Sequence, residues 1–290
     1  MKNNILLSVI IVTFKSNDII DDCIKSIIKY NDIGTALEIT IVDNSPNDDV
    51  MVDRIKKMYF SINVIKTNKN GGYGFGNNIG VDECRGKYFL ICNPDVRFVE
   101  PIFEKSISIL ENNDLIGLLG VKQLGGFSFF FRPDKFFPLA SFFLKIFNRL
   151  NLFLPRVMYL SGAFQFHRKH AFYEAGKFDE NIFLFSEETD FAIRLLKTKY
   201  KMKFIKDLHY YHPTFERQFN ENTFQVASKS LRYVCKKHGI DYQAYLRKKI
   251  IDLRIQKLFK KIIRKKYSNL DLQTNLLRTE LELYKKSSLI

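Results

Sequence analysis

Short apolar runs alternate with helical patterns from residue 6 to residue 92. Runs rich in Val, Ile and Leu are typical of strands that are buried on both faces of a sheet. The segments between them carry apolar residues at helical spacing. This order predicts an α/β fold, a mostly parallel sheet with helices on its faces. The expected strands are residues 6–14, 38–42, 62–66 and 87–92, and the expected helices are residues 18–30, 50–59 and 78–84.

Polar residues follow several of these apolar runs. Thr13 and Asp43 lie at the ends of the first two, and residues 93–95 (Asn-Pro-Asp) follow the fourth. Parallel sheets bind ligands at the carboxyl ends of their strands, so these side chains mark a candidate site. A second acidic signal, residues 187–188 (Glu-Glu), follows a later apolar run. Because a buried carboxylate is costly unless it is paired, the two signals predict one shared polar site.

Composition sets the broad class of the protein. The chain has 290 residues, of which 46% are hydrophobic, and this suits one large domain, alone or with an appendage. Its four cysteines are widely spaced and form no CxxC pair, which predicts reduced thiols rather than disulfides or a zinc site. The apolar run near the start is too short for a membrane span and lacks a signal-peptide cleavage pattern. The expected location is therefore the cytoplasm.

The net charge of +15 is concentrated near the C-terminus. Residues 229–266 contain 14 Lys or Arg and two Asp, a net charge of +12. With apolar residues at helical spacing, this predicts an amphipathic cationic helix that suits an anionic membrane surface. Nucleic acid is the rival partner, but no nucleic-acid-binding motif accompanies the charge, and a packed helix with a solvated basic face is a third interpretation. We expect a catalytic domain at residues 1–223 and a basic helical region at residues 224–290, with the role of the Phe-rich residues 127–154 left open.

Six segments along the chain carry a family resemblance. They are SVIIVTF at residues 8–14, IVDNSPND at 41–48, NKNGGYGFGNNIG at 68–80, CNPDV at 92–96, the stretch from SGAF to AIRL at 161–195, and a downstream histidine. In these segments the chain resembles the family 2 glycosyltransferases with the GT-A fold, in particular the rhamnosyltransferase-like branch that builds bacterial surface polysaccharides. The segments occur in the family's order, and residues after about 224 lie outside the resemblance.

The resemblance implies a site for a nucleotide-sugar. Asp43 matches the residue that accepts the N3–H of uracil or thymine, although Asp-Asn-Ser-Pro is also a good turn. Gly72 and Asn78 belong to the loop that lies against the nucleotide in this family, and Thr13 and Asn93 join the candidate donor-binding set. That loop lacks the G-x-G-x-x-G pattern, so a redox dinucleotide is not expected.

The resemblance also implies a divalent metal, Mg²⁺ or Mn²⁺. Asn93-Pro94-Asp95 stands where the family has Asp-x-Asp, so Asp95 would bind both the donor and the metal, which takes further oxygen ligands from phosphates and water. The alternative is a turn that closes the strand. A histidine would complete the metal site; the spacing favours His212, and His209 is the alternative.

An inverting transfer needs a base on the acceptor side. Glu188 occupies the position of the family's catalytic acid, where most relatives have Asp. Asp190 could serve instead if the register differs, and an acidic first turn favoured by the helix dipole is the structural alternative.

Together these residues predict an inverting, metal-dependent glycosyltransferase. The donor is a nucleoside diphosphate-sugar, with rhamnose favoured, and the acceptor is a lipid-linked glycan or polysaccharide of the bacterial surface, such as O-antigen or capsule. The enzyme would be peripheral at the inner face of the cell membrane, with an anionic membrane surface as a partner, no nucleic acid, and self-association left open. The alternatives are a non-catalytic membrane-surface scaffold with the same fold and a nucleotidyltransferase.

Overall fold

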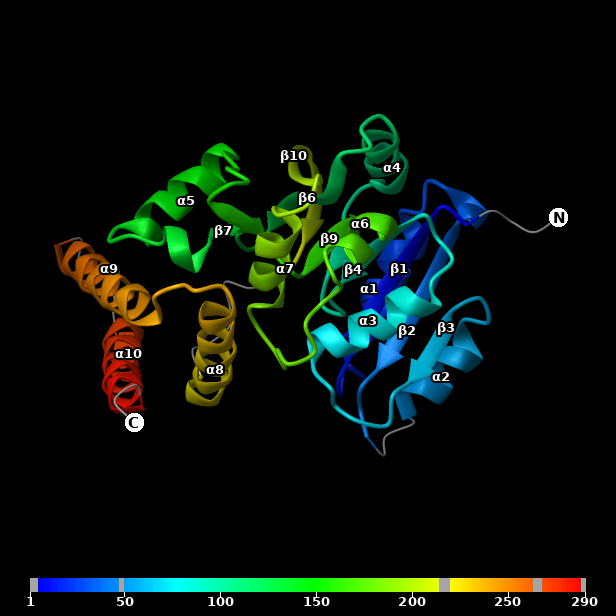
Figure 1. The fold of residues 1–290 in the computed structure, drawn as a ribbon. Helices are drawn as coiled ribbons and strands as arrows, with labels where there is room; N and C mark the ends of the chain where they lie inside the picture. Colours follow the sequence, from blue (N-terminus) through cyan, green and yellow to red (C-terminus); the bar gives the residue numbers. More distant parts are fainter. Residues whose placement is uncertain (1–4, 47–49, 214–219, 263–267, 288–290) are drawn as a thin grey trace. The chain divides into compact units, whose positions relative to one another are not determined.

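The computed structural model describes residues 5–46, 50–213, 220–262 and 268–287. The chain forms two compact units (Figure 1). The first, called the sheet unit, comprises Met1–Ser128 and Leu160–Arg217. The second, called the helical unit, comprises Phe129–Tyr159 and Gln218–Ile290. The expected domain boundary between residues 223 and 224 stays a prediction. The helical unit also includes Phe129–Tyr159, which the sequence analysis had placed in the catalytic domain.

Within the described residues, an eight-stranded sheet has the order β3-β2-β1-β4-β9-β6-β10-β5. Strands β3, β2, β1 and β4 are parallel, β10 is parallel to β6, β9 is antiparallel to both of its neighbours, and β5 is antiparallel to β10. The bounds are β1 (Leu7–Thr13), β2 (Leu37–Asp43), β3 (Asn63–Lys66), β4 (Tyr88–Cys92), β5 (Arg97–Phe98), β6 (Ile116–Leu124), β9 (Phe164–Arg168) and β10 (Lys201–Tyr211). The four strands expected in the first 92 residues are all present.

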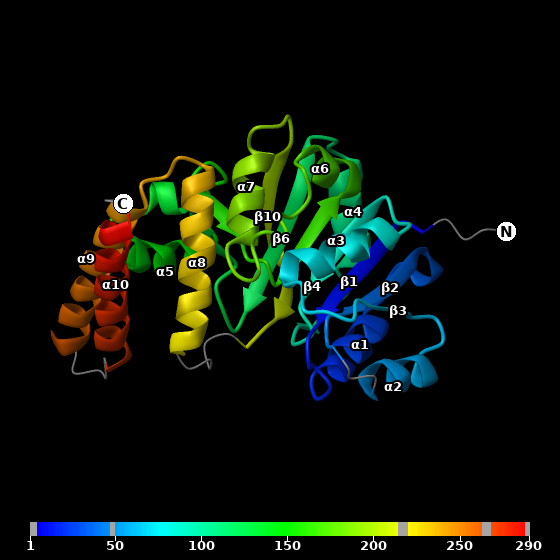
Figure 2. The same ribbon diagram turned by 60° about the horizontal axis from the view of Figure 1, so that its bottom comes forward.

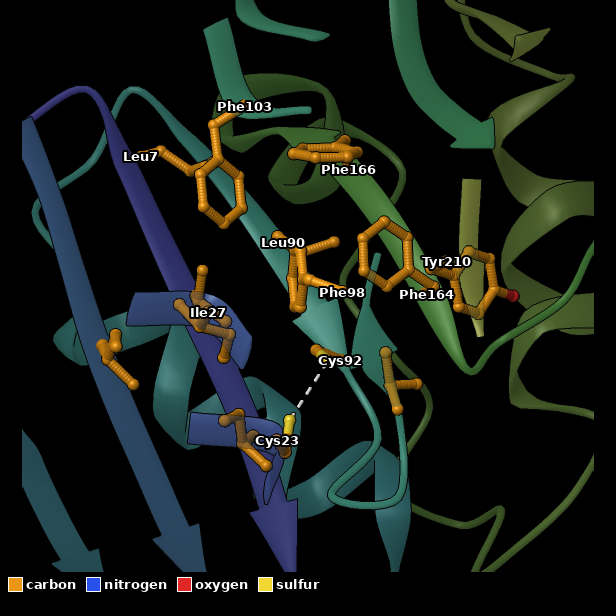
Figure 3. Packing of buried hydrophobic residues seen from close by; sticks show 14 of the residues in the cluster. Leu7, Cys23, Ile27, Leu90, Cys92, Phe98, Phe103, Phe164, Phe166 and Tyr210 are labelled. Atoms are coloured by element: carbon orange, nitrogen blue, oxygen red, sulfur yellow. Dashed lines mark hydrogen bonds between the residues drawn. The ribbon is translucent and has the colours of Figure 1, made fainter. Parts of the chain in front are cut away.

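Helices cover both faces of this sheet. The bounds are α1 (Ile20–Lys29), α2 (Val50–Met58), α3 (Tyr73–Glu83), α4 (Phe103–Glu111), α6 (Lys169–Glu174) and α7 (Glu187–Leu195), with a 3₁₀ turn at Gly34–Ala36. Apolar residues of α1, α2 and α4 share one buried cluster with Leu7, Val9 and Ile11 of β1. Figure 3 shows part of this cluster, in which the thiols of Cys23 and Cys92 are 3.9 Å apart. All four cysteines are free and buried.

Helix α3 packs on the opposite face and corrects one expectation. The sequence placed a loop before residue 78, but the helix begins at Tyr73 and includes the glycines. Glycine is a poor helix former, so packing decides this helix. A Cβ on Gly76 would lie 2.7 Å from Val12, and one on Gly80 would lie 2.4 Å from Ile10. The missing side chains therefore let the helix backbone approach β1 closely.

The helical unit has its own buried core. Its elements are β7 (Phe129–Phe131), a 3₁₀ turn (Pro133–Lys135), α5 (Ala140–Leu150), β8 (Met158–Leu160), α8 (Glu221–Lys237), α9 (Tyr242–Ile262) and α10 (Ser268–Ser287). Helices α9 and α10 lie side by side (Figure 2). Residues from α8, α9 and α10 form one apolar cluster around Tyr242 and Leu246. The basic residues 264–266, counted with the cationic helix above, lie outside the described residues.

Asp252 of α9 links that core to α5. It accepts hydrogen bonds from the backbone N–H and the hydroxyl of Ser141, at 3.0 and 2.6 Å. The Phe-rich segment, whose role the sequence left open, is thereby tied to the C-terminal helices. Among the described helices, none is both long enough and apolar enough to cross a membrane.

The close approach of α3 to β1 predicts that Gly80→Ala is destabilising. Alanine is the better helix former by about 1 kcal/mol, but overpacking a tight contact costs about 1–3 kcal/mol, and the second effect should win. We expect the free energy of unfolding, measured by urea denaturation, to fall by up to about 2 kcal/mol. Glu83→Ala, on the exposed side of the same helix, should change it by less than about 0.5 kcal/mol. An unchanged or higher stability of Gly80→Ala would show that α3 is not held by this contact.

Candidate active site

Parallel pairing brings several predicted residues to one edge of the sheet. Thr13 and Asp43 are the last residues of β1 and β2 and are paired in register. Strand β4 ends one residue before Asn93, and β10 ends one residue before His212. All four strands run in the same direction. The carboxyl edge of the sheet therefore carries the polar residues that the sequence selected.

Asp43 is fully buried, and only one of its oxygens has partners among the described residues. Oδ1 accepts hydrogen bonds from the Thr13 hydroxyl at 3.0 Å and the Ser45 hydroxyl at 2.8 Å. Oδ2 is buried with no hydrogen-bond partner in the described structure. A buried acceptor without a donor is costly, so this oxygen is suited to an N–H group of a ligand.

A pocket of about 130 Å³ lies beside Asp43. Asp43 does not line it, but Thr13 and Asn44 do. Gly72, also in its wall, has a φ of 94°, and a Cβ there would lie 2.1 Å from the carbonyl oxygen of Phe183. The Asn44 side chain donates a hydrogen bond to the Gly72 carbonyl at 2.9 Å. Gly72 therefore shapes the pocket wall through its backbone.

The amide of Asn78 contacts other protein groups rather than the pocket. It donates to the Phe178 carbonyl at 3.0 Å and to Glu180 at 2.9 Å, and it accepts from the Phe178 N–H at 3.0 Å. Asn78 thus holds the 178–180 segment against α3. Its direct contact with a nucleotide stays a prediction.

Asp95 lies against His212, the histidine that the sequence favoured, and not against His209. His212 Nε2 is 3.1 Å from Asp95 Oδ1, and its Nδ1 is 3.3 Å from Nε2 of Gln123. His209 instead pairs with Glu100, with its Nδ1 2.8 Å from the carboxylate. The two histidines therefore belong to different clusters, and His212 is the one beside the predicted metal residue.

This corner offers a small set of metal ligands. Asp95 supplies a carboxylate, His212 an imidazole, and the Oδ1 of Asn93 is buried without a partner among the described residues. No group of three or more His, Cys, Asp or Glu that could hold a metal occurs in the part of the chain that the structure describes. A hard divalent cation that keeps several ligands from phosphates and water needs few protein ligands, so these residues fit a cation held jointly with a diphosphate.

Glu188 reaches the same corner through the segment between β8 and β9. A Cβ on Gly162 would lie 3.3 Å from Oε1 of Glu188, so the carboxylate rests over this glycine. The next residue, Ala163, accepts a hydrogen bond from the Asn93 backbone N–H at 3.0 Å. Gly162 and Ala163 therefore link the two acidic signals of the sequence.

Two further residues lie near Glu188: Tyr73, which the sequence analysis missed, and Glu187, which it named only as part of the acidic pair. Tyr73 donates a hydrogen bond to the Gly162 carbonyl at 2.8 Å. Burial, with Glu187 and Glu188 close by, raises the pKa of Tyr73 well above 10, which keeps the hydroxyl protonated as a donor. The only available signals were the position of Tyr73 in the Gly-rich segment and of Glu187 in the acidic pair.

Glu187 is 2% exposed, and its Oε1 has no partner among the described residues. Burial and the nearby Glu188 raise the pKa of Glu187 well above its ordinary value. Burial also raises the pKa of Glu188, while the hydrogen bond with Glu187 lowers it. The arrangement favours a neutral Glu187 that donates to the Glu188 carboxylate. Glu188 itself is only half-buried and remains accessible.

Asp190 is engaged in a structural ion pair. It is fully buried, and one of its oxygens accepts from Nε and an Nη of Arg194 at 2.8 and 2.6 Å. Arg194 also donates to the carbonyls of Ala175 and Lys177. Asp190 therefore anchors the arginine that holds the 175–177 turn, which favours Glu188 over Asp190 as the acid directed into the site.

In a comparison with known protein families, residues 8–176 match the family described as Glycosyl transferase family 2. An uncharacterized glycosyltransferase of Haemophilus influenzae is 32% identical over 122 residues, which are 41% of this chain and 37% of that protein. The chain thus spans well under half of this relative.

Solved structures are similar in fold. The mannosyltransferase PcManGT from Pyrobaculum calidifontis, in complex with GDP-Man and Mn²⁺, aligns with a TM-score of 0.64 at 12% identity, over 95% of this chain and 84% of that one. Residues 1–349 of S. aureus TarS, in complex with UDP, align with a TM-score of 0.55 at 16% identity, over 98% and 92%. This chain also aligns with a longer structure of TarS, of which it covers 44%. These similarities confirm the predicted GT-A type of α/β fold.

The environment of Glu187 predicts a pH-dependent effect of Glu187→Gln on stability. Above the ordinary pKa of 4.5, the unfolded Glu187 loses its proton while the folded one keeps it, so wild-type stability falls as pH rises. Glutamine carries no such penalty. The stability gain of the variant over wild type should therefore be larger at neutral pH than below pH 4.5.

Urea denaturation at the two pH values measures this difference. Glu83→Gln, an exposed glutamate on α3, is the matched control and should show no pH-dependent gain. An equal difference for Glu187→Gln at both pH values would contradict the proton assignment.

Proposed function

The chain belongs to glycosyl transferase family 2, and we propose that it transfers a sugar with inversion from a nucleoside diphosphate-sugar to an acceptor hydroxyl. One observation carries this proposal: the Glu188 carboxylate lies over Gly162, and the adjacent Ala163 is hydrogen-bonded to Asn93. A candidate base and a candidate diphosphate-binding loop are thereby held together at the carboxyl edge of the sheet.

Glu188 is proposed as the general base. The acceptor oxygen attacks the anomeric carbon of the donor sugar from the face opposite the diphosphate, and its proton passes to Glu188. The bond from the anomeric carbon to the phosphate oxygen breaks, and its electron pair leaves with the diphosphate. The raised pKa of Glu188 suits this step, because a base works best when its pKa approaches the working pH.

Asp95, Asn93 and His212 are proposed to bind the donor diphosphate together with Mg²⁺ or Mn²⁺. The structurally similar PcManGT was solved with GDP-Man and Mn²⁺, which supports a metal in this type of fold. When bound, the cation would neutralise negative charge on the departing diphosphate. Gln123 and the Asp95 carboxylate contact opposite nitrogens of His212 and so set its orientation.

Asp43 and Thr13 are proposed to bind the nucleobase. The buried Oδ2 of Asp43 can accept one N–H, and uracil and thymine each present such a donor at N3. TarS was solved with UDP, which is consistent with a pyrimidine. The sequence resemblance to the rhamnosyltransferase-like branch favours a deoxythymidine diphosphate-rhamnose donor. A panel of nucleotide-sugars, scored by release of nucleoside diphosphate, tests both assignments.

The proposed acceptor is a lipid-linked glycan at the inner face of a bacterial membrane, in the synthesis of a surface polysaccharide such as O-antigen or capsule. The support is the charge of α9, which has seven Lys or Arg and one Asp. An enzyme held at an anionic membrane would meet such an acceptor at high local concentration.

The base assignment predicts that Glu188→Gln lowers kcat by a factor of about 10² to 10⁴, the usual contribution of a positioned base, with donor affinity little changed. Glu104→Gln is the matched control, because Glu104 also lies in the first turn of a helix and is exposed. Asp190→Asn should lower the melting temperature through loss of the Arg194 pair. If Glu188→Gln is fully active while Asp190→Asn folds normally and loses turnover, Asp190 is the base.

The metal assignment predicts that Asp95→Ala abolishes transfer and the dependence on Mg²⁺ or Mn²⁺ while the melting temperature stays within a few degrees. Asp95 is partly exposed at the end of a strand, so its removal leaves the core intact. Asp53→Ala, an exposed position on α2, should keep full activity. Metal-dependent turnover at the wild-type rate in Asp95→Ala would remove this residue from the metal site.

A further inference from the structure

Helices α5 and α9 of the helical unit enclose a pocket of about 240 Å³ that no predicted function uses. Its walls are mainly apolar and come from Leu139, Phe142, Ile255 and Phe259. Two basic side chains, Lys145 and Lys260, stand at the same pocket. The combination of an apolar wall with cations resembles neither a protein core nor an ordinary solvated surface.

The aromatic part of this pocket is exposed. The rings of Phe142 and Phe259 are stacked, with centroids 6.2 Å apart and planes at 9°, yet the two side chains are 48% and 53% exposed. Leu258 and Ile262, in the last turns of α9, are exposed as well. Clustered exposed apolar side chains usually mark a surface that contacts a partner or a membrane.

The charge of the surrounding surface is positive. Helix α9 has seven Lys or Arg against one Asp, and α5 adds Lys145 and Arg149. The single acid at the pocket, Asp252, is buried and accepts hydrogen bonds from Ser141 and Gln256, with Lys249 3.9 Å away. It is therefore already neutralised by its neighbours and does not oppose an anion at the pocket.

We propose that the α5–α9 pocket and its rim form a binding site for anionic phospholipid. Phe142 and Phe259 enter the acyl-chain boundary of the bilayer, and Lys145 and Lys260 contact the lipid phosphates. The arrangement follows the physics of interfacial amphipathic helices, in which apolar burial and attraction to anionic headgroups act together. The inference deepens the membrane location included in the proposed function, and it assigns that location to two helices rather than to the tail alone.

Two other occupants fit less well. A second copy of this chain would bring one strongly positive α9 against another, and like charges repel. Nucleic acid would match the charge and could stack on the phenylalanines, but Leu258 and Ile262 provide neither stacking nor hydrogen bonds. An anionic bilayer satisfies both the aliphatic and the cationic side chains.

The first experiment uses the absence of tryptophan from the chain. Phe142→Trp and Phe259→Trp each carry a single fluorescent reporter in the full chain. With phosphatidylglycerol vesicles, both should show a blue shift of emission and quenching by brominated acyl chains. Phe60→Trp, at a position that is 94% exposed in the sheet unit, is the control and should show neither. Emission from the α5–α9 reporters that stays unshifted would overturn the proposal.

The second experiment separates the two parts of the site by vesicle co-sedimentation. Lys145→Gln with Lys260→Gln should weaken binding to phosphatidylglycerol vesicles by roughly thirtyfold, the effect expected from two lysines at an anionic surface. Phe142→Ser with Phe259→Ser should also weaken binding but retain its salt dependence, because the lysines remain. The control, Lys105→Gln with Lys203→Gln, replaces exposed lysines of the sheet unit and should bind like wild type.

Several results would count against the site. These are wild-type binding in both pocket variants, equal binding to phosphatidylcholine and phosphatidylglycerol, and displacement of the Phe142→Trp and Phe259→Trp proteins from vesicles by a single-stranded oligonucleotide, read from the emission of these reporters. Each side chain changed is partly or fully exposed, so circular dichroism should show a normal fold. Neither assay uses a nucleotide-sugar, and donor hydrolysis can be measured without vesicles. Failure of the lipid site is therefore distinguishable from failure of the proposed sugar transfer.

Discussion

Parallel pairing of β1 with β2 and β4 is the constraint on which the rest of the sheet unit depends. It places the last residues of these strands at one edge, where Thr13 faces Asp43 and the 93–95 turn follows β4. Polar groups at the end of a buried strand are costly unless they find partners. Thr13 and Ser45 partner one oxygen of Asp43, while its other oxygen and Asn93 Oδ1 have none in the described structure. The edge thus retains unused hydrogen-bonding capacity where a ligand would bind.

The antiparallel strand β9 connects this edge to the second acidic signal. It pairs with both β4 and β6, so the 162–163 segment at its start arrives beside Asn93. Gly162 has no side chain, and the Glu188 carboxylate occupies the space that a Cβ would face. Asn93 and Glu188, which are about a third of the chain apart in sequence, are linked in this way through Gly162 and Ala163. The catalytic proposal depends on this crossing of β9 rather than on either motif alone.

The environment around Glu188 shows how burial can divide two adjacent carboxyl groups. Glu187 is buried, so its pKa is raised and the neutral acid can donate a hydrogen bond to Glu188. Glu188 keeps access to solvent on one side. Two glutamates in sequence thus have different surroundings at one helix start: Glu187 is buried, and Glu188, the proposed base, is half-buried.

By itself the sequence determined the order of strands, the polar ends of β1, β2 and β4, and the family, because short-range periodicity and local motifs are visible without tertiary contacts. The sequence wrongly predicted a loop where α3 begins, because glycine has a low helix propensity. The helix is stabilised instead by the close packing of Gly76 and Gly80 on β1, which the sequence does not show. Only the tertiary structure placed His212 beside Asp95 and His209 beside Glu100, and gave Asp190 a partner in Arg194. It also joined Phe129–Tyr159 to the C-terminal helices. These outcomes depend on contacts between residues far apart in the chain, which no local pattern specifies.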